Sequence, residues 1–257
     1  MTFLSSSTEP RHPIPAARLL DFRVGGGNHL SPEEVHLCLV SLRADEKDLA
    51  VCFDVLTPEE QLRTQKYLSV TARHDFLVSR AVLRGLIRAY CPQLPLNFAI
   101  SVGPFGKPYV ALAEMEVPLF FNVSHSGHIA LLGFSLEREI GVDIEEVRDI
   151  KGLVGIARTV FSERETEFFH SISDLERRAL FFRLWTCKEA LLKEEGTGFH
   201  RDPRSICLFS EIEHLDQNRR VLEFKGRFIQ SLTHPLGFAF AWALRSTESP
   251  ILRWIEG

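Results

Sequence analysis

The feature that most constrains the fold of this chain is a weak internal repeat with a spacing of about 105 residues. Thr57 and Ser162 are each followed three residues later by a glutamate, a pattern typical of the capping box at the start of a helix. The strand-like segment Val35–Leu42 falls on Ile140–Val147 at the same spacing. We therefore expect an α+β fold, a pseudo-dimer of two similar α+β halves packed face to face.

Hydrophobic periodicity predicts the main elements of both halves. A long helix is expected over Thr71–Tyr90 in the first half and over Ala179–Glu195 in the second, where glycines follow. Strands are expected at Val35–Leu42, Phe120–Val123, His128–Ser135, Ile140–Val147, Ser205–Leu208, Val221–Phe224 and Gly237–Leu244. Glu137 and Arg138 are expected to turn the strand ending at Ser135 back into the next one, as a hairpin.

The predicted domain boundaries follow from composition and from the repeat. Residues 1–31 are rich in Ser, Pro, Arg and Gly and are expected to form a flexible N-terminal tail without the apolar core of a signal peptide. Residues 32–136 are expected to form the N-terminal half, and residues 137–257 the C-terminal half.

Composition excludes several classes of protein. With 45% hydrophobic and 25% charged residues, the chain is ordinary for a globular protein. Its net charge of −4 argues against nucleic-acid binding, and no apolar run approaches the roughly 20 residues of a membrane span. The five cysteines are odd in number and contain no Cys-x-x-Cys pair, so we expect reduced thiols and a cytoplasmic location.

Two acidic motifs about forty residues apart point to chemistry. Asp143 and Glu145 alternate along a predicted strand and therefore share one face. Glu189 and Lys193 are neighbours at i and i+4 on a predicted helix. Three carboxylates suit Mg²⁺ and lysines beside them suit phosphate, which is the composition of a phosphoryl-transfer site. The alternative interpretation is a solvated acidic strand and a surface ion pair.

Two further motifs offer contacts for an anionic ligand. The segment Asn122–Gly127 places Ser124 and His125 at the end of a strand, where a hydroxyl, an imidazole and backbone amides can hold phosphate oxygens. Gly106-Lys107-Pro108 is a turn-rich segment. A plain surface turn is the alternative in both cases. A serine hydrolase is disfavoured, because Ser124 and His125 are adjacent and no third member of a triad is identifiable.

Together and in this order, the motifs resemble those of the Sfp-type 4′-phosphopantetheinyl transferases. The matching pieces are Gly106-Lys107-Pro108, Phe121–Gly127, Gly141–Glu145, Phe161-Ser162 with Glu165, and Trp185–Ala190 with Lys193. The resemblance runs from about Thr57 to about Gly198. It implies the family fold, in which two similar α+β halves of one chain enclose the active site in the cleft between them.

The resemblance also implies an activity. Such enzymes move the phosphopantetheine arm of coenzyme A onto a serine of an acyl, polyketide or peptidyl carrier protein and release 3′,5′-ADP. Mg²⁺ is implied as the metal, with Mn²⁺ as an alternative, and a monomer is expected because one chain contains both halves. Which carrier is used stays open.

Roles for individual residues follow by motif position. The implied metal ligands, all in the C-terminal half, are Asp143, Glu145 and Glu189. The implied catalytic residues are Glu189, as the candidate base, and Lys193, beside the diphosphate. The implied coenzyme A contacts are Arg63, Gly106, Lys107, Pro108, Ser124, His125, Lys188 and Lys193. Glu60 stands where the family often has a basic residue, and Asp75 stands near the usual Arg, with Arg73 and His74 beside it. Either those neighbours substitute, or the 3′-phosphate is held less tightly.

Two other classes of function remain to be tested. A non-catalytic module with this fold would recognise carrier domains without transferring anything, although the intact carboxylate trio argues against such decay. A metal-dependent phosphohydrolase would cleave a diphosphate without a carrier, but no water-activating base separate from the metal ligands is identifiable.

Overall fold

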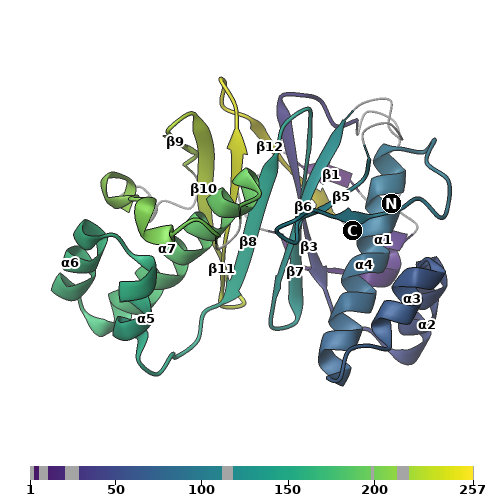
Figure 1. The fold of residues 1–257 in the computed structure, drawn as a ribbon, viewed down its shortest axis with the longest axis horizontal. Coiled ribbons are helices and arrows are strands. Elements are labelled where there is room, and N and C mark those ends of the chain that lie inside the picture. The colour runs from purple at the N-terminus through teal and green to yellow at the C-terminus, as the bar shows by residue number, and fades with distance from the viewer. Residues whose placement is uncertain are drawn as a thin grey trace.

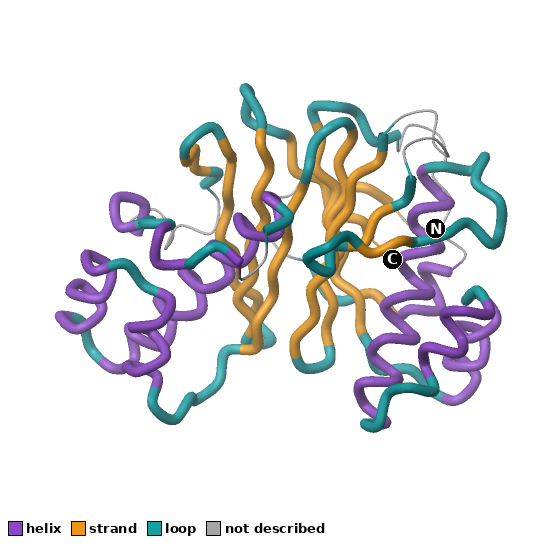
Figure 2. The backbone as a smooth tube through the Cα atoms, in the orientation of Figure 1, coloured by secondary structure: helices purple, strands orange, loops and turns teal. Residues whose placement is uncertain are grey.

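The computed structural model describes residues 3–5, 11–20, 29–111, 118–197, 200–212 and 220–256. Two β-sheets lie against each other in the centre of the molecule, and helices cover the outer face of each (Figure 1). Figure 2 shows the same layers, with the strands between two groups of helices. This arrangement fits the predicted α+β class.

The N-terminal half supplies one sheet and its helices. Its elements are β3 (Glu34–Ser41), α2 (Glu46–Val55), α3 (Pro58–Thr64), α4 (Val70–Tyr90), β4 (Ser101–Val102), β5 (Pro108–Tyr109), β6 (Leu119–Ser126) and β7 (Ile129–Leu136). The C-terminal half contains β8 (Ile140–Glu146), α5 (Leu153–Val160), α6 (Glu163–Ser171), α7 (Asp174–Glu195), the 3₁₀ turns η3 (Pro203–Ser205) and η4 (Phe209–Glu211), β9 (Leu222–Phe224), β10 (Arg227–His234) and β11 (Phe238–Arg245).

The internal repeat is confirmed by topology. In the first sheet β7 lies between β3 and β6, and in the second β11 lies between β8 and β10, all antiparallel. Both capping boxes form: Thr57 with Glu60 begins α3, and Ser162 with Glu165 begins α6. Each half thus has a first strand, helices and two further strands in the same spatial order.

Alternation along the strands builds three apolar layers. Between the two sheets lies a core that includes Leu37, Val142, Ile144, Trp242 and Trp254. The outer face of the first sheet packs on α4 and the outer face of the second packs on α7. Because side chains alternate across a strand, Asp143 and Glu145 face α7 while their neighbours fill the central core. This alternation places the acidic residues at the surface that α7 covers.

Several predicted elements differ from the structure. The expected hairpin is wrong, because β7 and β8 belong to different sheets and meet through side chains at the central core. A Cβ atom on Gly133 of β7 would lie 2.5 Å from Val142 Cγ1, so the two strands pack face to face there. The predicted strand Ser205–Leu208 is also wrong, since its first residue ends the turn η3 and the rest is loop. Strands β10 and β12 (Ile251–Glu256) were not predicted.

The described part of residues 1–31 is docked on the N-terminal half, in contrast to the expected flexible tail. Strand β1 (Phe3–Ser5) pairs with β12, and β2 (Ile14–Pro15) pairs with β3. Helix α1 (Ala16–Leu20) approaches α4 closely at Gly85, and both Ile14 and Leu19 are buried. Strand β12 pairs in parallel with β3, so the end of the chain joins the sheet of the first half.

Gly141 allows α7 to lie directly on β8. A Cβ atom at this position would be 1.9 Å from the backbone oxygen of Ala190 and 2.4 Å from the backbone nitrogen of Glu194. We expect Gly141→Ala to lower the free energy of unfolding by about 3 kcal/mol, because backbone atoms cannot yield as a flexible side chain does. Urea denaturation measures this loss.

A matched control exists in Gly155 of α5, where an added Cβ would meet nothing within 4 Å. Gly155→Ala should be neutral or stabilising by up to about 1 kcal/mol, because alanine favours a helix. Equal stabilities of the two variants would contradict the close approach at Gly141.

Candidate active site

Three side chains of β6 join the two sheets at one edge of β8. Asn122, Ser124 and Ser126 alternate along β6 and therefore point to the same side. Asn122 Oδ1 accepts a hydrogen bond from the backbone N–H of Val142 at 3.0 Å, and Ser124 Oγ donates to Asp143 Oδ1 at 2.8 Å. Ser126 Oγ donates to Glu145 Oε2 at 2.9 Å. The acidic strand is thus held in register by the other half of the molecule.

Helix α7 approaches the same two carboxylates from the outer face. Lys193 Nζ donates to Asp143 Oδ1 at 2.7 Å and to Ser124 Oγ at 2.9 Å. Trp185 Nε1 donates to Glu145 Oε1 at 3.3 Å. Trp185, Glu189 and Lys193 are spaced by four residues and line one side of the helix. The structure therefore brings Asp143, Glu145, Ser124 and Lys193 together, as the motifs predicted.

Glu189 lies between Trp185 and Lys193 and is nearly buried. Burial, chiefly, and the carboxylates of Asp143 and Glu145 raise the pKa of Glu189 from 4.5 to about 7, against the opposing effect of Lys193. Glu189 Oε1 and Asp143 Oδ2 are buried and have no hydrogen-bond partner among the described residues. Burying a polar oxygen without a hydrogen bond destabilises the folded protein. A bound cation or a proton donor between these two oxygens would remove that penalty.

Some, but not all, of the three carboxylates at this site have oxygens available to bind a hard divalent cation. Carboxylate oxygens are the ligands that Mg²⁺ prefers, and two of them are free of hydrogen bonds here. Both oxygens of Glu145 already accept hydrogen bonds. Within the described ranges, no three His, Cys, Asp or Glu side chains are gathered as a complete ligand set. Asp143 and Glu189 are therefore the residues best placed to hold a metal, with Glu145 beside them.

A pocket of about 410 Å³ opens next to this group. Residues of both halves line it: Phe105, Gly106, Lys107, Pro108, Asn122, Val123, Glu189, Lys193, Gly196 and His200. Two larger hollows, of about 840 and 620 Å³, are lined by neither Glu189 nor Lys193. The smaller pocket is the one that joins the buried carboxylate and the lysine to Gly106-Lys107-Pro108, and we take it as the candidate substrate pocket.

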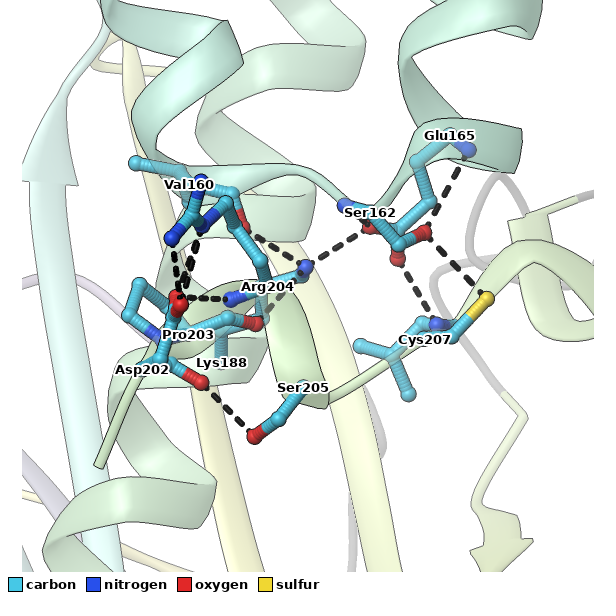
Figure 3. Close-up of polar contacts among 10 residues, drawn as sticks. Val160, Ser162, Glu165, Lys188, Asp202, Pro203, Arg204, Ser205 and Cys207 are labelled. Atoms are coloured by element: carbon cyan, nitrogen blue, oxygen red, sulfur yellow. Dashed lines mark hydrogen bonds and ion pairs between the residues drawn. The ribbon is translucent and has the colours of Figure 1, made fainter.

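Lys188 is not brought to this pocket. Its ammonium is fully buried on another side of α7 and donates to Glu165 Oε2 at 2.7 Å, to the Val160 carbonyl at 2.9 Å and to the Pro203 carbonyl at 3.1 Å (Figure 3). An ammonium has three protons, and all three are used. Burial lowers the pKa of Lys188 and Glu165 opposes that shift. Lys188 forms a structural ion pair instead of the expected phosphate contact.

Two other expected contacts lie apart from the carboxylates. Arg63 is exposed on α3, with its guanidinium carbon 4.9 Å from the centre of the Phe76 ring. His125 is exposed and, by alternation along β6, faces away from Ser124. It lies near Asp75. Burial raises the pKa of Asp75, and His125 and His74 oppose that shift. Neither Arg63 nor His125 lines the candidate substrate pocket.

Several residues of the site were not predicted from the sequence. Asn122 and Ser126 organise β8, and Trp185 holds Glu145, yet none of them was assigned a role. The signal was available in the spacing, because Asn122, Ser124 and Ser126 alternate in one strand and must share a face.

No described helix is long and apolar enough to cross a membrane.

Comparisons with known proteins agree with this site and fold. The family model described as the 4′-phosphopantetheinyl transferase superfamily matches residues 139–245. A second model, described as the N-terminal part of a 4′-phosphopantetheinyl transferase, matches residues 42–135. The two matches meet between β7 and β8, where the chain passes from one sheet to the other.

Curated relatives have the same description. The 4′-phosphopantetheinyl transferase HetI of Nostoc sp. is 34% identical over 169 residues, which are 66% of this chain and 71% of HetI. AcpT of Escherichia coli is 39% identical over 48% of this chain and 58% of its own length. Sfp of Bacillus subtilis is 27% identical over 56% of this chain and 61% of its own length. The matched residues thus cover less than two thirds of the length of AcpT and of Sfp.

These matches show that the chain belongs to the 4′-phosphopantetheinyl transferase superfamily. It is accordingly an enzyme of the class that transfers phosphopantetheine.

Proposed function

We propose that this enzyme transfers the 4′-phosphopantetheine arm of coenzyme A to a serine of an acyl, polyketide or peptidyl carrier protein, with Mg²⁺ as cofactor and 3′,5′-ADP as leaving group. The observation that supports the proposal best is the pair of buried, unpartnered oxygens on Asp143 and Glu189 beside Lys193. Carboxylate oxygens without hydrogen-bond partners can hold a metal ion, and a lysine beside them can contact a diphosphate.

Asp143 and Glu189 would hold the metal, with Glu145 as the third candidate ligand, and Mn²⁺ is an alternative ion. When bound, the ion neutralises charge on the diphosphate of coenzyme A. Lys193 uses two of its three protons on Asp143 and Ser124, and its side chain is 27% exposed. The remaining proton can be donated to a phosphate oxygen in the pocket, where it stabilises the departing 3′,5′-ADP.

The carrier serine requires a group that accepts its hydroxyl proton as the oxygen attacks phosphorus and the anhydride bond breaks. Glu189 is the candidate, directly or through a water, because its carboxylate lines the substrate pocket beside Lys193. Gly106, Lys107 and Pro108 would line the adenine side of the pocket. Ser124, His125 and Arg63 are proposed as further contacts for the nucleotide, with His125 at the 3′-phosphate.

Glu189 gives a test of the metal site that needs no transfer activity. Its pKa is higher in the folded state than the ordinary 4.5, so the stability associated with its proton is present below pH 4.5 and is lost as the pH rises toward about 7. In EDTA at pH 8, Glu189→Gln should therefore be more stable than the wild type by about 1–3 kcal/mol, and at pH 4.5 the two should be equal.

Adding Mg²⁺ at pH 8 should raise the unfolding temperature of the wild type more than that of the glutamine variant. Equal responses of the two proteins to Mg²⁺ would remove Glu189 from the metal site.

Intact-mass spectrometry of an apo carrier protein tests the reaction itself. Incubation with the enzyme, coenzyme A and Mg²⁺ should add one phosphopantetheine group, and EDTA or removal of the carrier serine should abolish the gain. Binding of coenzyme A without transfer to several carriers would indicate a narrow partner. Absence of both would favour the binding module, and release of 3′,5′-ADP without a carrier would favour a phosphohydrolase.

The proposed enzyme is a monomer, because one chain already contains both halves. A cytoplasmic location is proposed because five cysteines without a Cys-x-x-Cys pair are typical of a protein with reduced thiols.

A further inference from the structure

The geometry points to Lys107 as a positioning residue that clamps the wall of the pocket to α7, instead of a residue that contacts the substrate phosphates. Its ammonium donates to Glu139 Oε2 at 2.5 Å, to the Ile140 carbonyl at 2.9 Å and to the Lys193 carbonyl at 2.9 Å. An ammonium offers three protons and no acceptor, so none remains for a phosphate. Lys193, by contrast, uses two protons among the described residues.

The clamp joins the two halves. Lys107 lies in the connection between β4 and β5 of the N-terminal half, and its three acceptors lie at the start of β8 and in the last turn of α7. A tight turn fixes its backbone: Gly103 N–H donates to the Lys107 carbonyl at 2.9 Å, and Gly106 N–H donates to the Gly103 carbonyl at 3.0 Å. Gly106 has a φ of 87°, a conformation that glycine adopts without strain.

The position of the clamp explains its effect on the site. The Lys193 carbonyl is among the last carbonyls of α7, at the negative end of the helix dipole, where a cation is stabilising. Lys193 and residues 105–108 both line the substrate pocket, and residues 105–108 form the wall that the N-terminal half contributes together with Asn122 and Val123. Lys107 therefore sets the distance between the wall and the helix that bears Lys193 and Glu189.

The kinetic consequence rests on the proposed function. Without the hydrogen bonds of Lys107, residues 105–108 are no longer fixed relative to α7. The KM for coenzyme A should therefore rise about tenfold in Lys107→Met, which is the scale of one lost charge-assisted hydrogen bond. The value of kcat should fall less than threefold, because Lys193 keeps its bonds to Asp143 and Ser124. Glu139→Gln should raise KM in the same direction, by about threefold, although Glu139 does not line the substrate pocket.

The decisive comparison is Lys107→Met, Glu139→Gln and the double variant. Lys47→Met, at an exposed lysine of α2, is the control for loss of a lysine. For a clamp, the double variant resembles Lys107→Met alone, because both substitutions break one unit. For a direct phosphate ligand, Glu139→Gln leaves KM unchanged or lowers it, and that result overturns the proposal. Unchanged KM in Lys107→Met also overturns it.

Amide hydrogen exchange of the ligand-free protein separates this inference from the proposed function. Lys107→Met should speed exchange in residues 103–110 and 190–197 by about tenfold or more, while Lys47→Met leaves both segments unchanged. Unaltered exchange there overturns the clamp even if the wild type transfers phosphopantetheine. Faster exchange in a wild type without transfer activity would uphold the clamp and reject the proposed function.

Discussion

Asp143→Ala and Glu189→Ala are each expected to lower the rate of phosphopantetheine transfer by about 10²–10³-fold or more, the scale for losing a principal electrostatic contribution in an active site. Each substitution removes one of the two carboxylates of this site that have a buried oxygen without a hydrogen-bond partner among the described residues. Asp143→Ala also frees Lys193 from its ion pair at 2.7 Å. The loss is therefore one of chemistry at the site, with both proteins still folded.

The measurement is the rate of holo-carrier formation at saturating coenzyme A, with the folded state verified by circular dichroism. Glu146→Gln is the matched control, because Glu146 follows Glu145 on β8 and Ser126 Oγ contacts its backbone nitrogen instead of its carboxylate. That variant should keep its rate within about threefold, because the Glu146 side chain points to the opposite face of β8 from Glu145. Near-normal rates in folded Asp143→Ala and Glu189→Ala would reject the metal assignment.

Local chemistry made some parts of the fold predictable from sequence. A serine or threonine followed three residues later by glutamate satisfies the free N–H groups of a helix start within four residues, so the caps at Thr57 and Ser162 could be identified without any tertiary information. The alternation of Asp143 and Glu145 likewise needs only the geometry of a strand. The repeat of these local features was enough to predict two similar halves.

The features of the fold that could not be predicted from the sequence depend on packing between residues far apart in the chain. The chain after β7 could return as a hairpin or cross to the second sheet, and the choice depends on the central core that Leu37, Val142 and Trp254 fill together. Strand β12 pairs with β3, which lies more than 200 residues earlier, so no local pattern indicates it. The docking of Leu19 near Gly85 is of the same kind.

Lys188 and Lys193 lie on different sides of α7, and the helix period predicts this difference. Lys188 and Lys193 were both assigned to phosphate, yet five residues of a helix rotate a side chain by about 140° relative to the first. Glu189 and Lys193, four residues apart, share a side, and Lys188 cannot share it fully. The helix period alone separates the lysine of the pocket from the lysine of the interior.

Because Lys188 lies in the protein interior, its substitution should have a large effect on the stability of the fold and not on catalysis. Lys188→Met should lower the free energy of unfolding by about 3–5 kcal/mol, because it leaves the Glu165 carboxylate charged and buried without its cation. Glu165 also accepts a hydrogen bond from the backbone N–H of Ser162 at 2.7 Å (Figure 3). A second backbone N–H, that of Leu208, donates to Glu165 at 2.7 Å, so the carboxylate is held in place and cannot turn to solvent. Urea denaturation measures the loss.

The double variant Lys188→Met, Glu165→Gln distinguishes a lost ion pair from a lost side-chain volume. Glutamine keeps an acceptor for Ser162 and removes the charge, so the double variant should be more stable than Lys188→Met alone. Lys193→Ala should show the opposite profile, with a change in stability near 1 kcal/mol, since its side chain is partly exposed, and with a large loss of transfer. A folded Lys188→Met protein that transfers as poorly as Lys193→Ala would show that Lys188 acts in the chemistry after all.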